Sequence, residues 1–568
     1  MSALGRLARM PGFAEPGHAE SSYGGSSDQQ RERIVLYDTT LRDGAQTHGV
    51  EFSTLDKQII AAELDRLGVD YIEGGWPGAN PTDDAFFSNP PPLHRAKLCA
   101  FGTTRRPGRS ASNDPSLSAV LGAGTEAVCL VGKASDLAAE IALGVGPEEN
   151  LDLIVSSVEE AARHCAEVLF DAEHFFDGYL RNPEYALRCL RRAREAGASW
   201  LVLCDTNGGT LPEQIAAIVG RVVALLPEAA IGIHLHNDTE TAVAGSLAAI
   251  AAGARMIQGT LNGLGERCGN ANFTALIPTL ALKLRYRTGV DENGLRRLTE
   301  VSRMLDERLN RTPNPQAAYV GKNAFTHKAG LHAAAMLRDT TSYEHVAPER
   351  LGNGRRIIVS NQAGRANLLD GLRQLDLALR PDDPRITTLV ETVKRREFEG
   401  WGFDMAPASF ELLAHEVLNE APPPFRVISV RASESSAWSA DTGPTALCDV
   451  AVEIETGGQR RSARRESPDM LVCIIEVFRD LLLPSFPVLT GMRIIGSECR
   501  SFIRQTGAKP VTRFIVFSED AALPLPAWRT MGVSEKRIDA LFMALRDAFV
   551  IRLLRATGEQ ANGHAAAF

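Results

Sequence analysis

The chain has 568 residues, of which 44% are hydrophobic and 23% charged, and its formal net charge is -9. A chain of this length needs two or three packed domains, and its composition is that of a globular protein rather than a disordered, collagen-like or membrane chain. The acidic balance argues against a nucleic-acid partner, and no apolar run reaches the roughly 20 residues of a membrane span. We therefore expect a cytoplasmic protein with no nucleic-acid partner and no membrane partner.

The first segment, residues 1–31, has no continuous apolar stretch and passes into small and polar residues such as Ser21–Ser27. This pattern predicts a disordered leader, with a transit peptide as the alternative. The nine cysteines are scattered and form no Cys-x-x-Cys pair. We expect buried thiols in a reducing compartment rather than disulfides or a structural zinc site.

Residues 32–288 alternate between short apolar segments and longer ones that are amphipathic in places, such as Leu55–Leu67 and Glu184–Ala196. Eight of the short segments are predicted strands: Ile34–Asp38, Asp70–Glu73, Lys97–Phe101, Ala127–Val131, Glu167–Phe170, Trp200–Cys204, Ile231–His236 and Arg255–Gly259. Regular alternation of this kind predicts an α/β fold with a parallel sheet, and eight repeats match a closed (β/α)8 TIM barrel. An open doubly wound sheet is the structural alternative.

A barrel places its catalytic residues at the C-terminal ends of the strands. Polar segments follow predicted strands 1, 5, 6 and 7, namely Tyr37–Gly44, Asp171–His174, Cys204–Asn207 and His234–Asp238. We expect these segments to converge on one rim.

A candidate metal site lies in these segments. Residues i and i+2 of a strand point to the same face, so His234 and His236 project together. Asp43, which comes near them only if the sheet closes, completes a set of two histidines and one carboxylate. Asn270, after the last strand, is a candidate fourth or outer ligand.

Two alternatives to this interpretation follow from the same residues. A His-x-His pair alone is as typical of two structural histidines as of a metal site. A site with two histidines and one carboxylate also suits iron and oxygen chemistry. However, Arg42, Thr206 and Glu173 suit an anionic oxo acid and a proton transfer better.

Several motifs resemble those of the DRE-type barrel metalloenzymes, a family that includes the isopropylmalate, homocitrate and citramalate synthases and the HMG-CoA lyases. The shared motifs are Asp38–Gly44 with Gln46, His234–Asp238 and Gly263–Ala271. The segments most similar to the citramalate synthase branch are Ile72–Gly78, Asp171–Tyr179 and Leu203–Gly209. The resemblance extends from about Arg33 to Arg365.

The resemblance implies that Asp43, His234 and His236 bind a divalent ion, Mg2+, Mn2+ or Zn2+, with Asn270 near it. The ion would chelate a 2-oxo acid and act as a Lewis acid. Arg42 would stabilise negative charge on the ketone oxygen of the acceptor.

Further roles are assigned by the same resemblance. Thr206 would hold the acceptor carboxylate, and Glu173 would act as the base together with His332, a histidine brought in from beyond the barrel. Gln46, Glu73 and Tyr343 are expected to bind substrate. For His332 the alternative is a polar residue on an ordinary helix, and Trp76, near the same strand end as Glu73, is as typical of packing as of an acceptor pocket.

The function implied is the condensation of acetyl-CoA with pyruvate, followed by thioester hydrolysis, to give citramalate and CoA for branched-chain amino acid biosynthesis. The main alternative is the same reaction with a different 2-oxo acid. A carbon–carbon lyase and a catalytically silent metabolite sensor or scaffold are the other readings. Replacement of the family's Lys-Ser-Trp-Asp pattern by Lys133–Asp136 bears on the choice of acceptor.

Residues 289–421 are predicted to form helical linker subdomains, punctuated by prolines such as Pro313 and Pro348. In similar enzymes this region carries catalytic residues into the neighbouring subunit. A homodimer with domain-exchanged active sites is therefore expected.

Residues 422–556 are predicted to form a C-terminal α+β domain, and 557–568 a disordered tail. Two strand-strand-helix units repeat here, with strands Phe425–Ala432, Cys448–Glu455, Met492–Ile503 and Val511–Phe517 and helices Met470–Leu483 and Ser534–Leu554. This arrangement resembles a dimerisation and regulatory domain that binds an end-product amino acid. Arg465 and Ser467 replace family glycines and are expected to close the effector pocket. Cys268 is expected to be a small buried residue.

Overall fold

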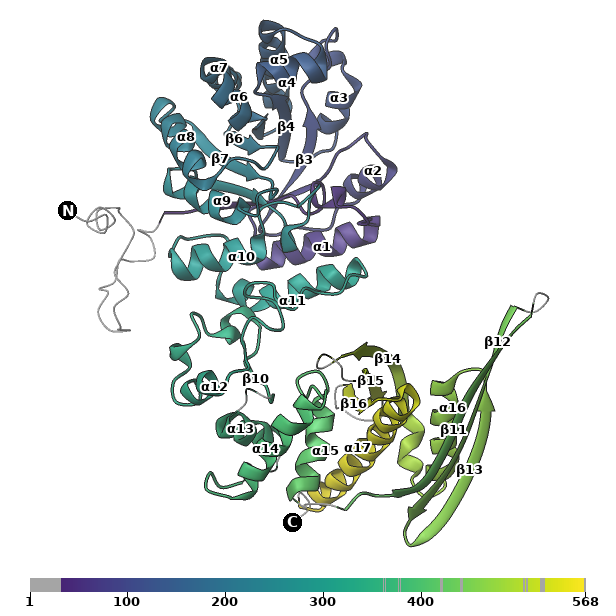
Figure 1. Cartoon of the computed structure of the whole chain (residues 1–568). Coiled ribbons are helices and arrows are strands. Elements are labelled where there is room, and N and C mark those ends of the chain that lie inside the picture. Colours follow the sequence, from purple (N-terminus) through teal and green to yellow (C-terminus); the bar gives the residue numbers. More distant parts are fainter. Residues whose placement is uncertain are drawn as a thin grey trace. The chain divides into compact units, whose positions relative to one another are not determined.

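The computed structural model describes residues 32–565 apart from 361, 363, 376, 378, 419–421, 440–442, 504–505, 507–508 and 522–526. The expected leader, residues 1–31, lies outside the described residues, as do residues 566–568 of the expected tail, whereas the helix α17 continues to Ala565. The chain divides into two compact units (Figure 1), of which the first contains residues up to 324 and 347–354 and the second contains 325–346 and the remainder.

Eight parallel strands form a closed barrel in chain order, because β1 pairs with both β2 and β8. The strands are β1 Val35–Asp38, β2 Tyr71–Gly75, β3 Lys97–Thr103, β4 Ala127–Lys133, β5 Glu167–Glu173, β6 Trp200–Asp205, β7 Ala230–Leu235 and β8 Met256–Gly259. The predicted TIM barrel is therefore confirmed, and the open sheet is excluded. The largest difference at a strand end is in β5, which extends to Glu173 rather than Phe170.

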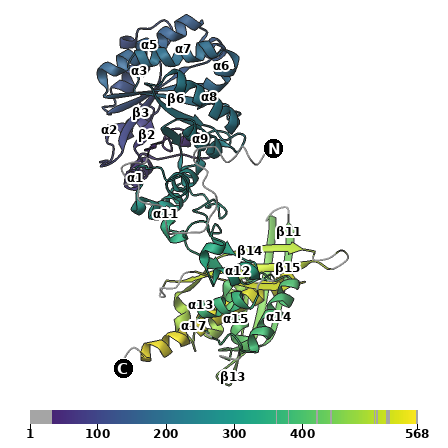
Figure 2. The same ribbon diagram turned by 90° about the vertical axis from the view of Figure 1, so that its left-hand side faces the viewer.

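Helices surround the barrel strands (Figure 2). They are α1 Thr54–Leu67, α2 Pro81–Ser88, α3 Pro115–Leu121, α4 Asp136–Leu143, α5 Pro147–His164, α6 Phe175–Arg181, α7 Pro183–Glu195, α8 Pro212–Leu225, α9 Ala242–Ala251, α10 Phe273–Pro278 and α11 Glu292–Arg308. Local sequence sets their ends. Ser53 and Asp56 form a capping box at the start of α1, and Gly68 ends it in the left-handed conformation.

The barrel interior follows the two-residue period of its strands. Apolar side chains fill it, among them Tyr71 on β2, Leu169 on β5 and Met256 on β8. Two positions further along these three strands, the same face carries Glu73, Asp171 and Gln258, all buried. The interior therefore changes from apolar to polar toward the C-terminal ends of the strands.

The second unit begins with a helical region that contains a two-stranded parallel sheet of β9 and β10. Its elements are β9 Thr326–His327, α12 Gly330–Met336, β10 Arg356–Ile357, α13 Arg365–Gln374, α14 Arg385–Phe398 and α15 Pro407–Leu418. The predominantly helical character predicted for this part is confirmed.

Two antiparallel three-stranded sheets, each followed by a helix, complete the second unit. The elements are β11 Arg426–Ser439, β12 Gly443–Thr456, β13 Gln459–Ser467, α16 Met470–Leu482, β14 Met492–Phe502, β15 Val511–Asp520, β16 Trp528–Ser534 and α17 Arg537–Ala565. The predicted α+β repeat is confirmed, but each unit has one strand more than predicted. β13 is polar and largely exposed, so no apolar alternation marks it.

The cysteine prediction is partly wrong. Six of the nine side chains are buried, but Cys268 and Cys499 are exposed, and all nine are free thiols. Cys268 lies in the loop after β8 beside Arg267, where the chain passes over the rim rather than through the core. Among the described residues no helix is long and apolar enough to cross a membrane.

Candidate active site

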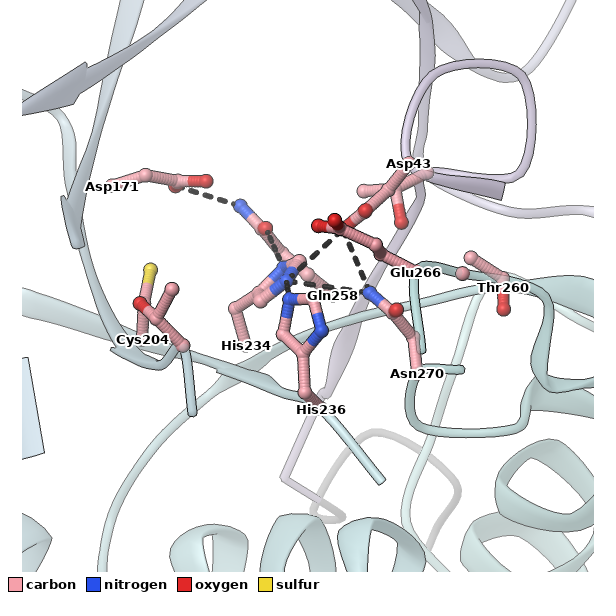
Figure 3. Close-up of polar contacts among 12 residues, drawn as sticks. Asp43, Asp171, Cys204, His234, His236, Gln258, Thr260, Glu266 and Asn270 are labelled. Atoms are coloured by element: carbon pink, nitrogen blue, oxygen red, sulfur yellow. Dashed lines mark hydrogen bonds and ion pairs between the residues drawn. The ribbon is translucent and has the colours of Figure 1, made fainter. Parts of the chain in front are cut away.

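Three elements bring the predicted metal ligands together at the C-terminal rim (Figure 3). Asp43 lies on a turn after β1 that is closed by a hydrogen bond from its backbone N–H to the Thr39 carbonyl. His234 is on β7 and His236 follows it, and an isolated bridge joins His236 to Asn270 on the loop after β8. The closed barrel therefore gathers residues that are distant in the sequence.

The donor atoms of this group lie close together in the interior. His234 Nε2 is 3.3 Å from His236 Nε2 and 3.2 Å from Asp43 Oδ2, and all three side chains are buried. Ligands about 2.0–2.2 Å from one ion lie about 3.0–3.4 Å apart, so these separations suit a shared divalent metal. Asn270 Nδ2 donates to Asp43 Oδ2 at 2.8 Å. The buried atoms His236 Nδ1 and Asn270 Oδ1 have no hydrogen-bond partner among the described residues.

The charges around the group favour the metal-binding forms of two ligands. Burial tends to raise the pKa of Asp43, but Arg42 and then His234 outweigh it, so the pKa lies well below its ordinary value. Burial, and then the charge of His234, lower the pKa of His236 to about 4. Burial also lowers the pKa of His234, yet the hydrogen bond and charge of Asp43 raise it overall. Near neutral pH, Asp43 is therefore anionic and His236 is neutral, as metal binding requires.

A glycine allows Asn270 to reach the ligand group. Gly265 has a φ of +157°, and a Cβ built there would lie 1.9 Å from Asn270 Oδ1. The loop is fixed on the other side by Thr47, whose hydroxyl accepts from the Gly265 N–H at 2.7 Å. Any side chain at position 265 would therefore displace Asn270.

A partly buried arginine lies beside the ligand group. The Arg42 Nε donates to Glu73 Oε2 at 2.5 Å, and its guanidinium lies 3.9 Å from the centre of the Phe101 ring. Glu73 also accepts from the Tyr37 hydroxyl at 2.8 Å. An Arg42 nitrogen is 3.6 Å from Asp43 Oδ2. Glu73 thus fixes Arg42 at the edge of the metal group, and its predicted binding of substrate stays a prediction.

The predicted base lies at the end of β5. Glu173 Oε2 pairs with the Lys133 ammonium group, and the β4–β5 register sets these residues side by side. The Thr206 hydroxyl accepts from the His174 N–H at 2.8 Å and is partly exposed at the same rim. Gln46 is exposed in the short helix Gly44–Gln46 after β1.

His332 and Tyr343 belong to the second unit, whereas the other predicted site residues belong to the barrel unit. Their rings stack with centroids 4.1 Å apart, and both side chains are exposed. Their predicted roles stay predictions, to be tested with a second subunit.

Sequence reasoning missed several residues that contact the predicted ones. Lys133 was predicted only as part of the variant motif Lys133–Asp136, although it ends β4 next to Glu173. Gln258 is the β8 partner of His234 in the strand register, and Asp171 hydrogen-bonds to Gln258. The sequence could have indicated all three, because the two-residue period of a strand places each of them on the same face as its interior apolar residues.

A separate cavity of about 280 Å3 lies in the C-terminal domain, between the first turns of α16 and α17. Its lining combines Asp469 and Arg537 with apolar residues such as Met470 and Phe514. Arg465 does not line it, since its guanidinium pairs with Asp480 at the surface. The closing of an effector pocket by Arg465 and Ser467 stays a prediction.

Comparison with known proteins gives a consistent result. Residues 33–303 match the HMGL-like family and 319–398 match the family described as homocitrate synthase post-HMGL domain-like. The chain is 42% identical to the (R)-citramalate synthase of Aquifex aeolicus over 92% of its own length and 98% of the relative's. It is 40% identical to that of Synechocystis sp. over 92% and 97%. A 2-isopropylmalate synthase of Heliobacterium modesticaldum is 32% identical over 63% and 69%.

Proposed function

This chain belongs to the family of the (R)-citramalate synthases, and from that membership we propose that it condenses acetyl-CoA with pyruvate. With one water molecule consumed, the products are citramalate and free CoA. The observation that carries the proposal is the near full-length match to these relatives, reinforced by a buried metal-ligand group beside an arginine and a carboxylate at the rim.

The ligand group Asp43, His234 and His236 would hold a divalent ion, Mg2+, Mn2+ or Zn2+, with Asn270 as a fourth or outer ligand. When bound, the ion supplies Lewis acidity toward the ketone and carboxylate oxygens of a 2-oxo acid. Arg42, already fixed by Glu73, stabilises the negative charge that develops on the ketone oxygen during bond formation.

The remaining steps fall to residues of the chain itself. Glu173 removes a proton from the methyl group of acetyl-CoA, and the resulting carbon nucleophile forms the new bond to the ketone carbon. The former ketone oxygen becomes a hydroxyl by taking up a proton. Water then cleaves the thioester and releases CoA as a thiol. Thr206 and Gln46 contribute contacts to the acceptor.

His332 and Tyr343 belong to this proposal as residues supplied by a partner subunit. Both are exposed on the second unit, so a homodimer that exchanges this region would complete each barrel. Mixing a Glu173→Gln variant with a His332→Ala variant tests this arrangement. Recovery of activity on mixing supports an active site shared between two subunits. A mixture that stays inactive at every ratio of the two variants contradicts it. We propose no nucleic-acid or membrane partner and a cytoplasmic location.

The alternative is that the acceptor is another 2-oxo acid, and the similarity to a 2-isopropylmalate synthase supports this alternative. We propose that Phe101 and Trp76, whose ring centroids lie 5.7 Å apart in an edge-to-face arrangement, help to shape the acceptor pocket. Thiol release with purified, metal-supplemented protein, acetyl-CoA and a panel of 2-oxo acids separates the two. We expect the highest kcat/KM with pyruvate. Turnover with 2-oxoisovalerate but none with pyruvate would show that pyruvate is not the acceptor and would support the alternative.

A further inference from the structure

A hydrogen-bonded chain behind the metal-ligand group carries the next inference. His234 Nδ1 lies 2.7 Å from Gln258 Oε1, and Gln258 Nε2 donates to Asp171 Oδ1 at 2.9 Å. All three side chains are buried, and Figure 3 shows the Gln258 amide between the other two. None of these contacts belongs to the reaction steps above.

The direction of these hydrogen bonds determines which ring nitrogen of His234 carries the hydrogen. A carbonyl oxygen only accepts, so His234 Nδ1 must carry the hydrogen when Gln258 Oε1 faces it. In the neutral ring the other nitrogen, Nε2, then has a free electron pair, and it is this atom that faces His236 and Asp43. Only this tautomer lets His234 ligate an ion through Nε2.

Asp171 decides which way the Gln258 amide points. Because Asp171 Oδ1 accepts from Gln258 Nε2, the amide N–H2 group points toward Asp171 and the carbonyl oxygen is left to His234. The reversed amide would donate to His234 Nδ1 and place the ring proton on Nε2, against the ion. The β7–β8 register makes Gln258 the direct neighbour of His234, so the backbone holds the arrangement.

We propose that Asp171 and Gln258 are positioning residues that hold His234 in its metal-binding tautomer and thereby set the affinity of the site for its divalent ion. This inference rests on the metal centre of the proposed function. Partners behind a metal-binding histidine commonly change metal affinity by about 10- to 100-fold when they are removed.

The test measures Mn2+ binding by the full chain in the absence of substrates, with free Mn2+ followed by electron paramagnetic resonance. Gln258→Leu and Asp171→Asn should each weaken binding by about 10- to 100-fold. The double variant Asp171→Asn with Gln258→Glu should recover most of the affinity. Its new carboxylate accepts from His234 Nδ1, and the new amide donates to that carboxylate.

Ser246→Ala is the matched control, because it removes a buried hydroxyl that only bonds within α9 and should leave Mn2+ affinity unchanged. Circular dichroism and thermal melting establish that each variant folds. Binding by folded Gln258→Leu equal to that of the parent overturns the role of the pair, as does a double variant no better than Asp171→Asn. A parent protein that binds no divalent ion overturns the proposed metal centre as well.

Discussion

The contact between Arg42 and Glu73 gives a sharp prediction about the barrel. Replacing Glu73 should lower both the melting temperature and kcat, and the two effects can be measured separately. The Glu73 side chain is fully buried and that of Arg42 is 12% exposed, with 2.5 Å between the charged groups. Replacing Glu73 with Leu leaves the guanidinium without its nearest counter-charge and Tyr37 without its acceptor.

The magnitude follows from these contacts. Breaking a buried pair from one side costs about 3–5 kcal/mol, and Asp43, 3.6 Å from Arg42, compensates in part, so about 3 kcal/mol is expected. The lost Tyr37 hydrogen bond adds about 1 kcal/mol. At about 2–4 °C per kcal/mol, the melting temperature of the barrel should fall by about 8–16 °C. Because Arg42 also loses its fixed orientation, kcat should fall by about 100-fold.

Differential scanning calorimetry and steady-state kinetics measure the two effects. The double variant Arg42→Met with Glu73→Leu removes both charges and should regain most of the lost melting temperature while staying inactive. The reasoning fails if Glu73→Leu melts within about 2 °C of the parent, or if the double variant is no more stable than the single one.

Three further predictions concern the site. Chelator-treated protein should lose thiol release and regain it with added divalent metal, whereas Asp43→Asn should not regain it at the same metal concentration; a chelated parent with full activity would contradict the metal assignment. Glu173→Gln should lower kcat by about 10²- to 10⁴-fold while Mn2+ affinity is kept, and a kcat near the parent's would remove Glu173 as the base. Gly265→Ala should weaken Mn2+ binding, because the new Cβ displaces Asn270, and unchanged affinity in a titration would show that Asn270 does not support the site.

The barrel and the metal-ligand group were predictable because their signals are local. A two-residue period placed His234 and His236 on one face, and strand ends marked Asp43 and Glu173. Contacts across the interior were not predictable, since the pairing of Arg42 with Glu73 depends on which rotamers meet in a closed barrel. The strand β13 was not predicted because its exposed, arginine-rich sequence lacks the alternating apolar residues that mark a half-buried strand. The exposure of Cys268 depends on the path of a loop, which no periodic pattern encodes.

The central claim is tested most directly by the fate of the acetyl carbons. Metal-supplemented protein is incubated with pyruvate and acetyl-CoA labelled with 13C at both acetyl carbons, and the products are examined by mass spectrometry. The account predicts a five-carbon hydroxy diacid, citramalate, carrying both labelled atoms and formed in step with free CoA. Release of CoA without a labelled five-carbon diacid, or no release with pyruvate, would contradict it.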